Sequence, residues 1–125
     1  MDKNFDKIYQ ESLKKPEDFW QKISDDIFWF KKPKQILDKK NPPFYKWFCD
    51  GITNTCYNAL DLHIDQGKGS KIALIYDSPI TGSKRKFTYN ELRDKVSKFA
   101  GALKNQGIDK GDRVIIYMPM IPEAV

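Results

Sequence analysis

The chain has 125 residues, of which 40% are hydrophobic and 31% charged, and its net charge at pH 7 is +5. This length and mixed charge exclude a disordered polymer and predict a globular chain with one small core that buries roughly two thirds of the unfolded surface. Its three arginines, Arg85, Arg93 and Arg113, lie far apart and its lysines are scattered, which predicts a solvated basic surface and no nucleic-acid interface.

Residues 4–30 predict a helical hairpin, because apolar residues recur at helical spacing in two short stretches. Pro16, followed by two acids, suits the first turn of the second helix. Phe28-Trp29-Phe30 is too rich in aromatics for one helical face. It predicts an extended segment that packs the hairpin onto a larger body, and packing is a more common role for such a cluster than base stacking.

Residues 31–51 predict a wrapping segment, since prolines at positions 33, 42 and 43 preclude long regular structure. A turn of helix is expected at Gln35–Lys39. Thr53 or Asn54 then caps a helix that ends near Gly67.

The pattern from residue 71 onward is α/β. Ile72–Tyr76 predicts a buried strand, Arg85–Thr88 a shorter strand that returns beside it, and Val114–Tyr117 a further buried strand. Between the last two, a capping box of Thr88 and Glu91 opens a helix that ends at Gly107. A hairpin, a crossover helix and a buried strand are expected at the edge of a mostly parallel sheet.

The chain stops at Val125, about one turn into a helix opened by Pro119 and Pro122. The strand just before it needs cover on both faces. We therefore expect more chain to follow in the intact protein, and we expect the 125 residues alone to be marginally stable or prone to aggregate.

Catalytic, cofactor-binding and metal-binding residues are predicted to be absent. The sequence has no glycine-rich phosphate loop and no nucleophile elbow. His63, the single histidine, lies on an apolar helical side, which favours packing. Asp61 and Asp65 share a helical side and are interpreted as solvated or structural. Cys49 and Cys56 are spaced too widely for a zinc half-site, and we expect small buried thiols in a reducing compartment and no disulfide.

The sequence also predicts a protein without membrane segments. No apolar run is long enough to cross a bilayer, and the first residues lack the apolar stretch of a signal peptide. Two acids and no arginine among the first six residues argue against a mitochondrial presequence. A cytosolic location is therefore expected, and a mitochondrial one is left open.

Four sequence blocks occur in the order found in one enzyme family. They are Ser12 with Pro16–Trp20, Trp47–Gly51 running into Asn54–Asp61, Ala73–Pro79, and Lys110–Val114 with Tyr117–Ala124. KGDRV is common among adenylating enzymes, but the block from WF to CYNALD is much narrower. The chain resembles the N-terminal part of short-chain acyl-CoA synthetases of the acetate and propionate type, members of the adenylate-forming enzymes.

The resemblance implies an α/β fold with a helical cap region at residues 1–66 and the truncated beginning of the AMP-binding domain at residues 67–125. Pro42-Pro43-Phe44 and the CYNA and YDSP strings are closer to the propionate-CoA ligase branch than to the acetate branch. Two positions depart from the family. Leu62 stands where arginine is usual, and Asp50 stands where glycine is common.

For the intact protein the resemblance implies a reaction in two steps. A carboxylate attacks the α-phosphate of ATP with Mg²⁺ to give an acyl-adenylate, and CoA then displaces AMP. In the family the groups that contact ATP, CoA and the acyl chain lie further along the chain than Val125, so the isolated 125 residues are expected to be inactive. The alternative is a truncated, non-catalytic interaction module that binds a full-length homologue or another protein through exposed apolar faces.

Overall fold

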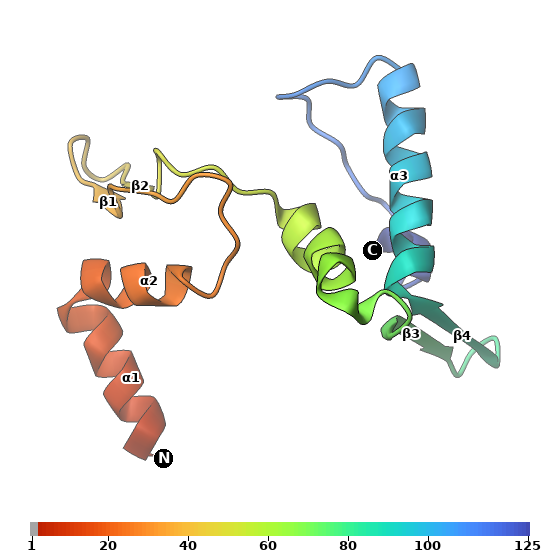
Figure 1. The fold of residues 1–125 in the computed structure, drawn as a ribbon, viewed down its shortest axis with the longest axis horizontal. Helices are drawn as coiled ribbons and strands as arrows, with labels where there is room; N and C mark the ends of the chain where they lie inside the picture. The colour runs from red at the N-terminus through yellow and green to blue at the C-terminus, as the bar shows by residue number, and fades with distance from the viewer. Residues whose placement is uncertain (1–2) are drawn as a thin grey trace. The chain divides into compact units, whose positions relative to one another are not determined.

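The computed structural model describes residues 3–125. The chain divides into two compact units, the first extending to Asn58 and the second spanning Ala59–Val125, and each is described by itself. The first unit contains two helices and a small strand pair, and the second contains a hairpin and a long helix (Figure 1). Helices with small antiparallel sheets are what an incomplete α/β domain contains, as the sequence predicted.

Two helices open the first unit. α1 spans Lys3–Lys14 and α2 spans Pro16–Ser24, and the two helices meet at Lys15 and diverge at a wide angle (Figure 1). The two predicted helices form, but the apolar side of α1 is not packed, since Phe5 is 61% and Leu13 59% exposed. Pro16 lies at the start of α2 and is followed by Glu17 and Asp18, so the first turn lacks an amide that would go unpaired and has acids near the positive end of the helix dipole.

A short strand pair follows in the first unit. β1, Leu37–Asp38, pairs antiparallel with β2, Lys46–Trp47. The predicted turn of helix at Gln35–Lys39 is therefore wrong. The Phe48 N–H donates to the Ile36 carbonyl at 2.9 Å, so the backbone groups that a helical turn would pair locally are bonded across the sheet instead.

The predicted helix after residue 54 forms, but mostly as π-helix. Its two π-helical stretches are η1, Tyr57–Asp61, and η2, Ile64–Lys68. Asn54 Oδ1 accepts a hydrogen bond from the Tyr57 N–H at 2.9 Å, as the predicted cap requires. Gly67 has a φ of +76°, a backbone conformation that favours glycine and ends the regular helix where the sequence predicted.

The predicted hairpin of the second unit is confirmed. β3, Ile72–Ser78, pairs antiparallel with β4, Ser83–Thr88, and α3 packs against both strands. The burial predicted for the first strand is wrong, because Ile75 is 64% exposed. A two-stranded sheet that carries a helix on one face leaves its other face to solvent.

Helix α3, Tyr89–Asn105, begins as predicted (Figure 1). Thr88 Oγ1 accepts from the Glu91 N–H at 3.2 Å, and a Glu91 carboxylate oxygen accepts from the Thr88 N–H at 2.8 Å. This reciprocal pair is the capping box. Gly107, with a φ of +83°, follows the helix and turns the chain back, as expected.

The strand predicted at Val114–Tyr117 does not form. Residues 113–117 have no regular structure, and Ile115 and Tyr117 are 88% and 99% exposed. A strand is held by hydrogen bonds to a neighbouring strand, and no described backbone pairs with this segment. The helix expected after Pro119 is a single 3₁₀ turn, η3, at Pro122–Ala124.

The predicted core is also wrong. Leu60, 8% exposed, is the only buried hydrophobic residue in the described part of the chain. Phe5 and Leu13 of α1 and Phe99 of α3 are each about 60% exposed. The sequence provides amphipathic faces with the correct spacing, but the described elements cover these faces only in part.

Candidate functional site

The aromatic residues of the first unit form a packed framework. The Phe28 and Phe30 rings lie 4.9 and 5.0 Å from the Tyr57 ring and 5.1 Å from each other. The Trp29 ring lies 5.6 Å from Phe48. Rings at these distances and tilts stabilise one another, so the predicted packing role of residues 28–30 is confirmed.

Asn58 connects the helix that carries Tyr57 with the backbone of Phe28. Its Oδ1 accepts from the Phe28 N–H at 2.8 Å, and its Nδ2 donates to the Phe28 carbonyl at 3.1 Å. The side-chain amide thus pairs with both backbone groups of one residue, as a neighbouring strand would. Nδ2 also lies 3.0 Å from Thr53 Oγ1 and from the Asn54 carbonyl. An asparagine of the CYNALD block therefore holds a segment 30 residues away.

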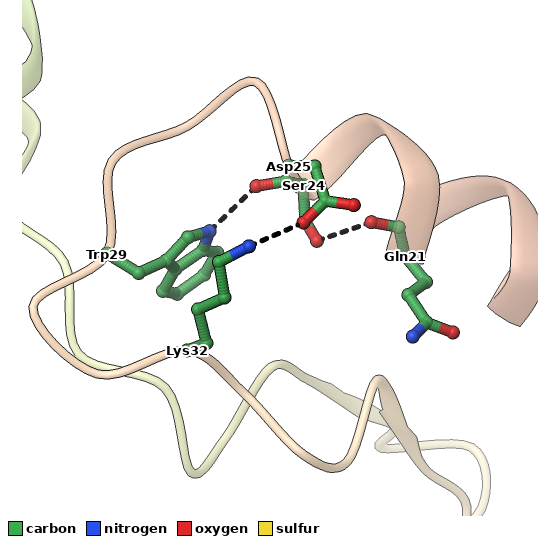
Figure 2. A network of polar contacts seen from close by, with 5 residues as sticks. All are labelled: Gln21, Ser24, Asp25, Trp29 and Lys32. Carbon is green, nitrogen blue, oxygen red and sulfur yellow. Dashed lines mark hydrogen bonds and ion pairs between the residues drawn. The ribbon is translucent and has the colours of Figure 1, made fainter.

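A polar chain links α2 to the Trp29 segment (Figure 2). The Trp29 Nε1–H donates to the Ser24 carbonyl at 2.8 Å, and Ser24 Oγ donates to the Gln21 carbonyl at 2.7 Å. Ser24 is 7% exposed, so its hydroxyl needs the partner that Gln21 supplies. Asp25 and Lys32 form an exposed ion pair beside it, with 2.8 Å between Oδ1 and Nζ.

Asp50, one of the two departures from the family pattern, has a structural role. Its carboxylate accepts from the Lys34 N–H at 3.0 Å and from the Gln35 N–H at 3.2 Å. These backbone hydrogen bonds hold the pKa of Asp50 below its usual value. A Cβ on the next residue, Gly51, would lie 2.7 Å from the Trp29 ring, so a side chain there would force the ring or the backbone to shift.

In the second unit the candidate residues also serve packing and capping. The His63 ring lies 4.9 Å from the Tyr89 ring, and its Nδ1 is buried without a hydrogen-bond partner. Backbone and hydroxyl hydrogen bonds from Thr88 lower the pKa of Glu91. Asp61 is half-buried, and its interpretation as a solvated or structural carboxylate stays a prediction.

The two cysteines differ from the prediction in one respect. Cys49 and Cys56 are free thiols, as expected, but both are exposed and not buried. Burial of a small residue depends on what covers it, and both the turn that carries Cys49 and the helical start that carries Cys56 leave the thiol exposed. The Cys49 thiol has one polar neighbour, Gln35 Oε1, at 3.9 Å.

Within residues 3–125 the structure groups no three metal-ligating side chains in one place. No helix in that range has the length and apolarity that a bilayer span requires. A hollow of about 360 Å³ in the first unit has a charged lining, and two of its lining residues, Lys39 and Glu17, form an ion pair. It is lined by Lys14, Lys15, Pro16, Glu17, Asp18 and Lys39.

Two polar side chains of the first unit, Asn58 and Asp50, thus form hydrogen bonds with backbone groups of distant residues. The sequence did not predict these hydrogen bonds, although Asn58 lies in the block that carried the family signal.

Two family patterns match the chain. The pattern for the acetyl-coenzyme A synthetase N-terminus matches residues 5–59, and that for AMP-binding enzymes matches residues 62–125. The chain belongs to the AMP-binding enzyme family, and its first part is of the acetyl-coenzyme A synthetase type.

Individual relatives agree with this assignment. Human acyl-CoA synthetase short-chain family member 3, mitochondrial, is 53% identical over 114 residues, which are 91% of this chain and 17% of that protein. Acetyl-coenzyme A synthetase of Streptomyces coelicolor is 48% identical over 84% of this chain and 16% of its own length. Propionate–CoA ligase of Escherichia coli is 43% identical over 97% of this chain and 19% of its own. The chain thus spans less than a fifth of these relatives.

Proposed function

We propose that this chain is the N-terminal portion of an AMP-forming short-chain acyl-CoA synthetase. The observation that carries the proposal is the match of the two family patterns, in order, along residues 5–59 and 62–125. The intact enzyme would convert a short carboxylate, ATP and CoA to acyl-CoA, AMP and pyrophosphate. The names of the relatives, which include an acetyl-CoA synthetase and a propionate–CoA ligase, support this chemistry.

Residues 3–125 supply structure to that enzyme and no catalytic group. Residues 1–66 form the cap region and residues 67–125 begin the AMP-binding domain. Stabilising the charge on a transferring phosphate needs a cluster of donors or cations around it. The most constrained polar groups here, Asn58 and Asp50, already bond to backbone. ATP, Mg²⁺ and CoA would therefore be bound by the rest of the enzyme.

Within the family we propose a propionate-type enzyme. The support is the sequence strings at residues 42–44, 56–59 and 76–79, which are closer to that branch. The acyl pocket would lie outside this chain, so the strings indicate ancestry and do not select the substrate.

A chimera tests the proposal. The aligned N-terminal part of Escherichia coli propionate–CoA ligase, 43% identical over 121 residues, is replaced with that of this chain. AMP and propionyl-CoA formation are measured with propionate, ATP, Mg²⁺ and CoA, beside the ligase with the same part deleted. We expect activity in the chimera and none in the deletion.

Two controls make the chimera experiment more specific. Asn58→Ala in the chimera should lower activity through loss of the Phe28 contact, and Asn105→Ala at the end of α3 should not. The preference for propionate over acetate should equal that of the parent ligase, because the pocket is unchanged. A folded chimera without activity would contradict the proposed function. A changed preference between propionate and acetate would contradict the proposal that these residues do not contact the substrate.

A further inference from the structure

Residues 31–52 form a loop whose two ends are bonded to each other, and we call it the closed loop. The Lys31 N–H donates to the Ile52 carbonyl at 3.2 Å, and the Ile52 N–H donates back to the Lys31 carbonyl at 2.9 Å. Near this base the Asp50 carboxylate accepts from the Lys34 N–H at 3.0 Å. Surface loops with close ends that are held by their own contacts are frequently functional.

The tip of the closed loop is fixed by hydrogen bonds of its own. The pairing of β1 with β2 makes residues 39–45 the turn of a hairpin. Within this turn the Phe44 N–H donates to the Asn41 carbonyl at 2.8 Å, and the Tyr45 N–H donates to the Pro43 carbonyl at 3.1 Å. The backbone that carries the two aromatic residues is therefore preorganised, and a contact made through them would cost little ordering of the chain.

Aromatic side chains are exposed at this tip. Phe44 is 73% exposed, Tyr45 53% and Trp47 42%. A single exposed apolar residue is normal on a protein surface, but three large ones within four positions of a fixed turn are typical of an interaction surface. Rigid aromatic side chains give a large contact area at a low entropic cost. Phe44 and Tyr45 are thus the residues through which the closed loop would make a contact.

The closed loop also holds most of the excess positive charge of the chain. It has six lysines and two aspartates, so it carries four of the five net positive charges. Both aspartates, Asp38 and Asp50, accept from backbone N–H groups of the loop itself. Lys40 and Lys46, on either side of the tip, form no ion pair in the described part of the chain. Because lysine is strongly hydrated and is buried only with a charged partner, a surface that covers the tip needs an apolar centre and an acidic rim.

The length of the relatives indicates where such a surface lies. The aligned residues are 17% of the human relative and 19% of the Escherichia coli ligase, so more than four fifths of a protein of that length lies outside them. We propose that the closed loop docks through Phe44 and Tyr45 into an apolar site with an acidic rim, on the part of the AMP-binding domain that this chain does not contain. The docking fastens the cap region to the catalytic body. It requires the rest of the enzyme and so rests on the proposed function.

The test uses the full-length chimera described above, with the photoreactive residue p-benzoylphenylalanine in place of Phe44. Irradiation links this side chain to the residues that lie against it, and mass spectrometry of the digested protein identifies them. We expect a link within one molecule to the part of the ligase that follows the exchanged segment, at apolar residues with Asp or Glu beside them. AMP formation by the same chimera tests the proposed function, so a failure of the docking and a failure of that function are distinguishable.

Variants of the tip are compared with the same photoreactive residue moved to position 45, in place of Tyr45. Phe44→Ala should lower the yield of the link by roughly fivefold or more, as expected for the truncation of a central contact residue. Lys40→Glu with Lys46→Glu should lower it by roughly two- to fivefold, because charges at the rim of a contact contribute less. Ile80→Ala is the matched control and should leave the yield unchanged, since Ile80 is 94% exposed in the turn of the other hairpin.

The position of the link decides between the possible occupants of the tip. A link from position 44 only to a second molecule, or only to residues of this chain, would overturn the proposal, and so would a folded chimera without any link. A linked site without carboxylates, or an equal loss of yield in Ile80→Ala, would also overturn it. If the chimera does not fold, residues 31–52 alone replace the aligned residues of the Escherichia coli ligase, and the same link is sought in that protein.

Discussion

The contacts inside the first unit differ in kind from those inside the second unit. In the first unit, side chains bond to backbone far away in sequence, such as Asn58 to Phe28 and Asp50 to Lys34. In the second unit, the structure rests mainly on a hairpin between adjacent strands, a helix packed on that hairpin, and a capping box that spans the four residues 88–91. The first unit should therefore be sensitive to single polar substitutions, and the second should lose stability in small local steps.

The largest effect is expected for Asn58→Ala. It removes the hydrogen bonds to both backbone groups of Phe28 and leaves the N–H without this partner, while the carbonyl still accepts from the Thr53 hydroxyl at 2.7 Å. We expect the free energy of unfolding of the first unit to fall by roughly 2–3 kcal/mol. Tryptophan fluorescence in a urea titration measures the change. Asn105→Ala in α3 is the matched control, and an equal loss in that variant would remove the distinction between the units.

Gly51→Ala and Gly101→Ala form a second contrast. A Cβ at position 51 would lie 2.7 Å from Trp29, whose ring is fixed by its bond to the Ser24 carbonyl, so we expect a loss of about 1–3 kcal/mol. At position 101 a Cβ would meet nothing within 4 Å, and alanine favours the helix, so we expect a gain of roughly 0.5–1 kcal/mol. Thermal unfolding followed by circular dichroism measures both. The comparison fails if the two variants shift stability in the same direction.

Thr88→Ala tests the local nature of the second unit. It removes the hydroxyl that accepts the Glu91 N–H, and the loss of such a cap costs about 1 kcal/mol. Hydrogen exchange of the first amides of α3 should speed up while amides of the first unit stay unchanged. Thr88→Ser keeps the hydroxyl and should retain most of the protection. A loss of protection throughout the first unit would contradict the prediction.

The smallest effect is expected for Asp50→Asn and depends on pH. Hydrogen bonds to Lys34 and Gln35 lower the pKa of Asp50, so the folded chain favours its ionised form. This stabilisation is present above the usual pKa near 3.8 and is lost as pH falls through the lowered value. Urea midpoints of the two chains should differ at neutral pH and converge in acid. A difference that persists at the lowest pH would show that charge is not its source.

Local signals explain which parts of the fold the sequence predicted. The capping box of Thr88 and Glu91 and the apolar spacing of α3 are complete within 17 residues, so they could be identified directly. The strand expected at Val114–Tyr117 needs a partner strand, and β-rich sequence alone does not supply one. The same limit applies to Gln35–Lys39, where pairing with β2 overrode a helical expectation.

Burial and long-range bonds could not be predicted for the same reason. Cys49 and Cys56 are apolar enough to be buried, but their exposure depends on cover from other elements. Asn58 stood out as part of a narrow motif, yet its partner Phe28 lies 30 residues earlier and no spacing rule connects them. Arg85 and Glu123 form an ion pair across 38 residues, and no spacing rule predicts that pair either.

The central claim is that these residues supply structure to an acyl-CoA synthetase and no chemistry. The direct test is AMP formation from ATP, Mg²⁺, CoA and propionate or acetate by the purified 125-residue chain, beside the active chimera. The account predicts no AMP above a control without carboxylate for the chain and carboxylate-dependent AMP for the chimera. Carboxylate- and CoA-dependent AMP formation by the 125 residues alone would contradict it.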